Sequence, residues 1–174
     1  IAVETIAKTA PPAADPARLA AAVEAANAAV IEAAMNGLGK PGMGCTATCA
    51  YIENDTLAIA HVGDSRAYLL HDGTLIRVTR DHSYVEELVD AGEITADEAR
   101  VHPNRSVITR ALGSDPAMYA DHFQLNIEEG DRLILCSDGL SSMVPDSDIE
   151  NIATQSSTAQ ICVDNLVDAA LAAG

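Results

Sequence analysis

The chain has 174 residues, with 10 Lys and Arg against 26 Asp and Glu, and its formal net charge is −16. This length suits one domain that buries a core, and an apolar fraction of 48% excludes a disordered chain. No apolar run approaches the ~20 residues that a membrane span requires. The acidic balance argues against a nucleic-acid binder, which needs clustered Lys and Arg, but it suits hard cations bound by carboxylates.

The cysteines predict a protein of a reducing compartment, which we take to be the cytoplasm. The four are Cys45, Cys49, Cys136 and Cys162, and their spacing forms no short disulfide framework. On a strand, Cys45 and Cys49 would lie roughly 13 Å apart, too far to share one zinc ion. We therefore expect cysteines that serve the structure rather than a metal.

The N-terminal part of the chain is predicted to be helical. Residues 1–14 read as a helix end followed by a Pro-rich loop, and the Asp-Pro pair at 15–16 is a typical helix start. Apolar residues then recur at helical spacing over 19–34. We place Glu24 and Asn27 elsewhere on the helical wheel, outside the face that these apolar residues form.

A series of short strands follows, rich in Thr, Val, Ile, Leu and Tyr. The first four are predicted at 44–52, 56–62, 66–71 and 74–79. Short turns separate them, among them Gly-Asp-Ser at 63–65, and such short connections predict antiparallel hairpins. Two further strands, 121–127 and 131–137, are predicted on either side of a turn at 129–130.

Residues 81–113 interrupt the strands with a helical insertion. Capping boxes that begin at Ser83 and Thr95 open two short helices, 84–90 and 96–101. Two closing helices are predicted at 146–154 and 158–172. Helices before and after an antiparallel sheet indicate the α+β class.

Two aspartates occupy positions that suit a metal site. Asp64 and Asp138 each follow an apolar strand, and each has a neighbouring Gly that lets the backbone turn sharply. Strand ends hold ligands rigidly. Both residues also read as ordinary turn aspartates, and two carboxylates complete a Mg²⁺ or Mn²⁺ shell only with water and substrate oxygens.

Five segments, in order along the chain, resemble motifs of the PP2C-like metal-dependent protein phosphatases. They are similar most of all to the bacterial, actinobacterial-type Ser/Thr branch. The segments are residues 42–48 (Gly-Met-Gly-Cys-Thr-Ala-Thr), 61–66 (His-Val-Gly-Asp-Ser-Arg), 79–83 (Thr-Arg-Asp-His-Ser), 102–113 (His-Pro-Asn-Arg, then Ile-Thr-Arg-Ala-Leu-Gly) and 135–140 (Leu-Cys-Ser-Asp-Gly-Leu).

The resemblance implies an α-β-β-α sandwich, in which two antiparallel sheets are flanked by helices. It implies that Asp138 ligates the catalytic metal pair of Mn²⁺ or Mg²⁺ ions, and that Asp64 ligates a third, weaker metal. The implied reaction is hydrolysis of phosphoserine and phosphothreonine in proteins, the targets of a Ser/Thr kinase, by a metal-bound water. No side-chain nucleophile is then needed.

The resemblance also implies that residues 81–113 form a flap beside the active site. His102, Arg105 and Arg110 are its candidate substrate residues, because Arg pairs well with phosphate. The alternative is that the arginines pair with acidic residues on a solvated face. For His102, which precedes a proline, the alternative is a structural role at the helix end.

Parts of the family pattern are absent at both ends. Before this region the family has Arg-x-x-Asn-Glu-Asp and Asp-Gly-Met-Gly-Gly segments, and after it a Gly-x-x-Asp-Asn segment, none of which occurs here. The chain also opens with Ile1 rather than Met. We therefore expect residues 1–174 to be a single, partial phosphatase domain that lacks N- and C-terminal strands and part of the metal site.

Two other functions fit parts of the sequence. The missing ligands favour a non-catalytic regulatory module of the same fold. The Gly-Asp-Ser at 63–65 also suggests a serine esterase with Ser65 as nucleophile, but no His follows residue 140 to serve as its base. An anti-sigma-factor-type phosphatase remains an alternative within the leading fold.

Overall fold

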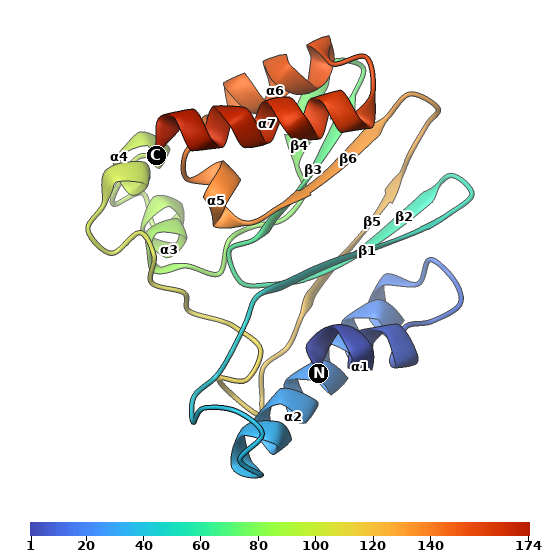
Figure 1. Cartoon of the computed structure of the whole chain (residues 1–174), viewed down its shortest axis with the longest axis vertical. Helices are drawn as coiled ribbons and strands as arrows, with labels where there is room; N and C mark the ends of the chain where they lie inside the picture. The colour runs from blue at the N-terminus through green and yellow to red at the C-terminus, as the bar shows by residue number, and fades with distance from the viewer. The chain divides into compact units, whose positions relative to one another are not determined.

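The computed structural model describes residues 1–174, and its contacts divide the chain into two units. Unit 1 comprises Ile1–Asp64 and Asp81–Ile127, and unit 2 comprises Ser65–Arg80 and Glu128–Gly174. Each unit has one three-stranded antiparallel sheet with its own helices (Figure 1). The α+β class with two antiparallel sheets flanked by helices is thereby confirmed. The single domain over 1–174 stays a prediction.

Unit 1 is built on the sheet β1-β2-β5, with β2 in the centre. Helix α2 packs on one face of this sheet, and α1 lies against α2 with Ala2 and Ile6 packed on the same core (Figure 1). The elements of unit 1 are α1 (Ala2–Thr9), α2 (Pro16–Met35), β1 (Ala47–Glu53), β2 (Thr56–Val62), α3 (Tyr84–Asp90), α4 (Ala96–Val101) and β5 (Asp121–Asn126).

Helix α2 begins as its sequence predicts. The Asp15 side chain accepts a hydrogen bond from the Arg18 N–H at 3.0 Å, and Pro16 is the first helical residue. One prediction for α2 was wrong, because Asn27 is only 2% exposed and lies on the packed face. Its amide is satisfied there, since it donates to the Asp115 carbonyl and accepts from the Gly113 N–H. The helix thereby anchors the end of the flap segment.

Strand β2 is buried on both of its faces. Ala58, Ala60 and Val62 join the hydrophobic cluster that α2 covers. Leu57, Ile59 and His61 alternate with them and therefore point to the opposite face, where they are also fully buried. A strand buried on both faces reads as a continuous apolar run. This burial makes β2 a rigid support for the residues that follow its end.

Unit 2 is built on the sheet β4-β3-β6, with β3 in the centre. Its helices cover one face, where Tyr68 and Leu70 of β3 pack against Ile149, Cys162 and Leu166. The elements of unit 2 are β3 (Arg66–His71), β4 (Thr74–Arg77), β6 (Arg132–Cys136), α5 (Asp138–Ser141), α6 (Asp146–Gln155) and α7 (Ala159–Ala173).

One of the predicted hairpins, at residues 63–65, is wrong. The turns at 53–55 and 72–73 do join paired strands, β1 to β2 and β3 to β4. In contrast, the turn at 63–65 joins β2 to β3 and the turn at 128–131 joins β5 to β6, and in both cases the two strands belong to different sheets. Turn length alone did not distinguish the two kinds, because a sharp bend after Gly63 (φ +110°) takes the chain out of its sheet.

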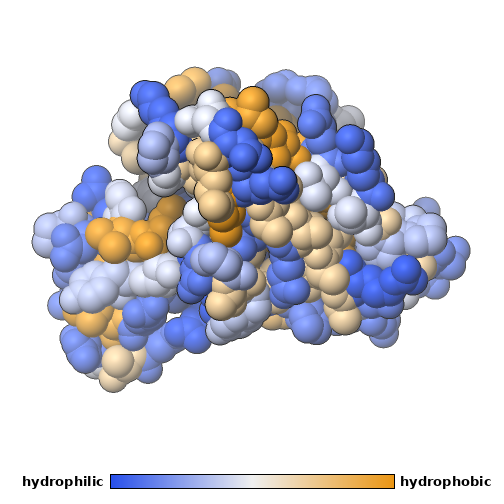
Figure 2. All heavy atoms as spheres, turned by 90° about the horizontal axis from the view of Figure 1, so that it is seen from below, coloured by the Kyte–Doolittle hydropathy of each residue, from blue (hydrophilic) through white to orange (hydrophobic).

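Several large apolar side chains remain on the surface. Figure 2 shows apolar and polar atoms interspersed over one face of the molecule. On α7, Val163, Val167 and Leu171 form an exposed stripe at four-residue spacing. No helix has the length and hydropathy needed to cross a membrane.

Candidate metal and flap residues

Asp64 lies directly after β2, in the turn that leaves unit 1, and is half-buried. The preceding Gly63 is obligatory, since its φ is +110° and a β-carbon there would collide with the Thr46 side chain. The buried strand and this constrained glycine fix where the Asp64 backbone begins. Asp64 therefore lies at the end of a rigid strand, as the sequence predicted.

Asp138 lies directly after β6 in unit 2, as the first residue of the single-turn helix α5. Its side chain is exposed. Strand β6 pairs with β3 from Arg66↔Cys136 to Leu70↔Arg132, so the strand that delivers Asp138 is held along its length. The two candidate aspartates thus follow strands of different sheets.

The donor chemistry of these residues fits Mn²⁺ or Mg²⁺, because both ions prefer carboxylate oxygen. Their number does not complete a shell. No group of three or more His, Cys, Asp or Glu side chains is placed to hold a metal ion. The chain thus offers single ligands at strand ends rather than an assembled centre.

A buried His pair lies beside the Gly63 turn, and sequence reasoning gave it no role. The rings of His61 and His82 lie with their centroids 4.9 Å apart, and the two residues are 0% and 7% exposed. Thr48 Oγ1 lies 2.9 Å from His61 Nδ1. His82 Nε2 lies 3.0 Å from Asp121 Oδ2. Polar groups are thus concentrated at the end of the sheet where Asp64 begins.

Arg110 binds the other carboxylate oxygen of Asp121. Its guanidinium donates to Asp121 Oδ1 at 2.6 Å and to the Tyr119 hydroxyl at 2.9 Å. The guanidinium carbon also lies 4.0 Å from the centroid of the Tyr119 ring, which is a cation–π contact. Arg110 therefore directs its donors to groups within unit 1.

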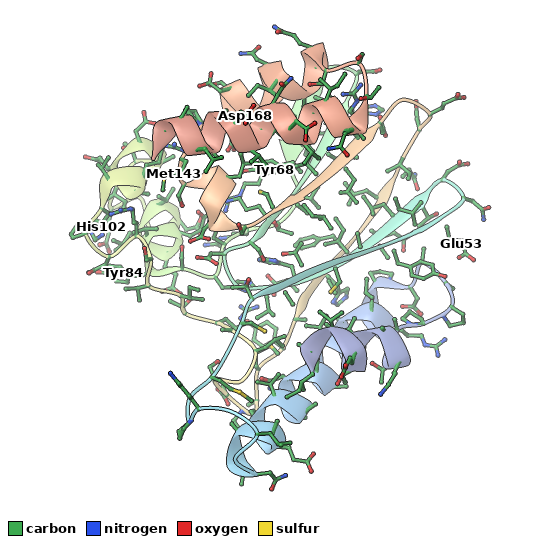
Figure 3. All side chains as sticks on the ribbon, in the orientation of Figure 1. Glu53, Tyr68, Tyr84, His102, Met143 and Asp168 are labelled. Atoms are coloured by element: carbon green, nitrogen blue, oxygen red, sulfur yellow. The ribbon has the colours of Figure 1, made fainter.

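His102 and Arg105 lie in the loop after α4. The His102 ring contacts the Tyr84 ring of α3, with centroids 5.9 Å apart (Figure 3), and its Nδ1 accepts the Asn104 N–H. This position, as the C-cap of α4, suits a structural role. The Arg105 side chain is exposed. Of the three candidate flap residues, Arg105 is the most accessible to a phosphate.

Burial and pairing shift the ionisation of this network. Burial lowers the pKa of His82, although the hydrogen bond to Asp121 opposes the change. Burial raises the pKa of Asp121, but the hydrogen bonds from His82 and Arg110 outweigh it and hold the pKa below its ordinary value. Near neutral pH the network therefore holds a neutral His82, an ionised Asp121 and a cationic Arg110.

Sequence reasoning missed two residues of this network, Asp121 and His61, as well as Asn27 of α2. Asp121 was placed only as the start of a strand, and its pairing in register with His61 is seen only in the structure. His61 is a lone polar residue in an apolar strand. Asn27 recurs four residues after Val23, at the spacing of the apolar face. For His61 and Asn27, the signal was a polar residue at a buried position of a periodic pattern.

The chain belongs to the protein phosphatase 2C family, whose model matches residues 15–174. Among curated proteins, a serine/threonine phosphatase stp of Listeria welshimeri is 39% identical over 130 residues, which is 75% of this chain and 52% of that protein. The serine/threonine protein phosphatase PstP of Mycobacterium tuberculosis is 43% identical over 136 residues, 76% of this chain and 26% of that protein. The chain thus spans about half or less of these curated relatives.

Solved structures agree with the family. The Mycobacterium tuberculosis serine/threonine phosphatase PstP/Ppp matches with a TM-score of 0.88 and 37% identity, over 99% of this chain and 73% of that chain. The catalytic domain of PstP in complex with two manganese ions matches with a TM-score of 0.87 and 34% identity, over 99% of this chain and 73% of that chain. The fold expected from the resemblance is confirmed, and the solved relative contains the metal expected for the family.

Proposed function

We propose that this chain is part of a metal-dependent protein phosphatase that hydrolyses phosphoserine and phosphothreonine in proteins. The observation that carries the proposal is the match of almost the whole chain to a phosphatase catalytic domain solved with two manganese ions. Carboxylates at the ends of supported strands, which are the donors this chemistry requires, add to it.

In this proposal the two aspartates act as metal ligands. Asp138 holds one of the catalytic pair of Mn²⁺ or Mg²⁺ ions, and Asp64 holds a third, more weakly bound ion. The ions supply an activated water and neutralise charge on the phosphoryl oxygens. Asp138 is exposed to solvent, which suits a ligand that must reach a bound ion.

The flap has a substrate role in this proposal. Arg105 is the arginine we expect to meet the substrate phosphate, because its guanidinium is exposed. His102 and Arg110 support the flap through their contacts with Tyr84 and Asp121. The substrates are phosphoproteins produced by a Ser/Thr kinase, and four free cysteines support a cytoplasmic location.

The test is Mn²⁺-dependent release of phosphate from a phosphothreonine peptide. This chain is compared with the full-length gene product and with its Asp138→Ala variant, each with and without EDTA. We expect activity in the full-length protein that is lost with EDTA and falls by at least about 100-fold in the variant, because a metal ligand is removed. Full activity of Asp138→Ala in EDTA would exclude a metallophosphatase.

A second candidate is a non-catalytic regulatory module of the same fold. The observation that favours it is the absence of any group of three or more metal-ligating side chains in this chain. The same assay separates the two functions. A full-length protein that folds and binds its phosphopeptide but releases no phosphate at any Mn²⁺ concentration would establish the module.

A further inference from the structure

Both backbone polar groups of Gly63 are held by one residue. The Gly63 N–H donates to His82 Nδ1 at 3.0 Å, and the His82 N–H donates to the Gly63 carbonyl at 2.7 Å. His82 comes from the first residues of the flap segment, 19 positions further along the chain. The turn that carries Asp64 is therefore closed by a distant residue rather than by its own strand.

The hydrogen bonds of His82 fix which ring nitrogen carries the proton. Because Nδ1 accepts the Gly63 N–H, the proton of the neutral ring lies on Nε2, which then donates to Asp121 Oδ2. Asp121 is the first residue of β5 and is also held by Arg110 at 2.6 Å. The carboxylate thus keeps the ring in the tautomer and orientation that Gly63 requires.

The contacts around Gly63 leave the turn little freedom. Gly63 is buried and packs so closely against Thr46 that no side chain fits there. The His82 carbonyl is itself held by the Thr109 N–H at 2.8 Å, and Ser83 pairs with Ile108 across the base of the flap. The next residue after this fixed point is Asp64. Because the Gly63 backbone is held in place, the position of the adjacent Asp64 carboxylate is restricted as well.

We propose that His82 is a positioning residue for Asp64, and that Asp121 acts through His82 by holding its ring. The inference rests on the proposed function, because it takes Asp64 as a metal ligand. Groups that orient metal ligands without touching the metal commonly contribute 10–100-fold to metal affinity. We expect His82 to act on Mn²⁺ binding at Asp64 and to have little effect on a site that lacks Asp64.

Two substitutions separate the two hydrogen bonds of the ring. In His82→Asn the amide oxygen lies near the place of Nδ1, so the bond from Gly63 is kept and the bond to Asp121 is lost. In His82→Gln the amide N–H reaches the place of Nε2, so the bond to Asp121 is kept and the bond from Gly63 is lost. Both variants lose one buried hydrogen bond, so a purely structural role predicts similar effects for both.

The experiment measures Mn²⁺ binding to the full-length protein from the loss of the free-Mn²⁺ EPR signal. The site of interest is the one that disappears in Asp64→Asn. We expect its affinity to fall about tenfold in His82→Gln and by less than about threefold in His82→Asn. In the Asp64→Asn background, His82→Gln should change no remaining Mn²⁺ affinity, since coupled residues are not additive. His71→Gln, which breaks a His–Asp pair in unit 2, is the matched control and should leave the site unchanged.

Other results would overturn the inference. Equal losses in His82→Asn and His82→Gln, or a loss that persists in the Asp64→Asn background, would reduce His82 to a structural residue. No Asp64-dependent Mn²⁺ site at all would remove the residue that His82 is proposed to position. A failure of the proposed function is seen separately, as a lack of phosphate release that does not depend on any of these variants.

Discussion

Each unit of the molecule contains a hydrogen-bonded pair of a histidine and an aspartate, and the histidines of the two pairs differ in their surroundings. His82 and Asp121 in unit 1 are 3.0 Å apart, and the His82 side chain is 7% exposed. His71 and Asp131 in unit 2 are 2.8 Å apart, but the His71 side chain is 36% exposed. The shorter pair thus has the more solvated histidine, although its aspartate is the less exposed of the two, at 9% against 31%. Distance alone therefore does not indicate which pair matters more to the fold.

The environment of each pair determines its ionisation. Burial lowers the pKa of His82, so that its ring is neutral and donates one proton to a fixed partner. The hydrogen bond to the Asp131 carboxylate raises the pKa of His71, so that its ring gains a proton readily. The His82 pair connects the flap with the β2 turn, whereas the His71 pair has a half-exposed histidine that solvent screens.

The largest expected effect comes from the glycines of the two turns. Gly63→Ala should destabilise the protein by about 3 kcal/mol or more, because it combines a strained φ with a collision against Thr46. Gly73→Ala, in the turn beside His71, should cost only about 1 kcal/mol, because nothing lies within 4 Å of its β-carbon. Urea unfolding of both variants measures the difference. Equal losses would show that the packing around Gly63 is not tight.

Loss of the carboxylate that His82 and Arg110 share should come next. Asp121→Ala leaves the His82 Nε2–H and the Arg110 guanidinium without their shared acceptor, and we expect a loss of about 2–3 kcal/mol. Asp131→Ala removes one acceptor from a single, half-exposed histidine that water can reach, and it should have a smaller effect. Chemical unfolding at neutral pH compares the two. A larger loss for Asp131→Ala would reverse the assignment of the His82 pair as the structural one.

A smaller effect is expected at the second partner of Asp121. Arg110→Lys keeps the charge but loses the second donor, which binds the Tyr119 hydroxyl, and the flat contact with the Tyr119 ring. We expect a loss of about 1 kcal/mol. The matched variant Tyr119→Phe removes only the hydroxyl and should cost less. Thermal unfolding of both variants tests whether Arg110 is held by geometry or by charge alone.

The smallest effect is on the pH dependence of stability. The folded pKa of His71 is raised, so its stabilisation is fully present below its unfolded pKa of 6.5 and is lost as pH rises through the folded pKa. The folded pKa of His82 is lowered, so the unfolded state binds the proton first and stability falls as pH drops below 6.5.

Unfolding free energies of metal-free protein at several pH values from about 5 to 8 measure both effects. Compared with wild type, His71→Gln should lose stabilisation on the acid side of this range. His82→Gln should lose the decline that wild type shows there. The same slope in both variants would contradict the opposite environments of the two rings.

The sequence by itself determined much of the local structure of this protein. The N-cap of α2, the capping box of α4 and the runs of β-branched residues specify their elements through short-range hydrogen bonds and periodicity. The placement of Asp64 and Asp138 after apolar strands was predictable for the same reason. The family motifs are the basis of the proposal that those carboxylates bind metal ions.

Tertiary structure decided which strands share a sheet and which polar residues meet. The turns at 63–65 and 128–131 resemble hairpin turns in sequence, yet they join strands of different sheets. The contacts of His82 with Gly63 and Asp121 join residues 19 and 39 positions apart. Local propensity carries no information about such partners, because they are selected by the burial of whole strands and by the need to satisfy each buried polar group.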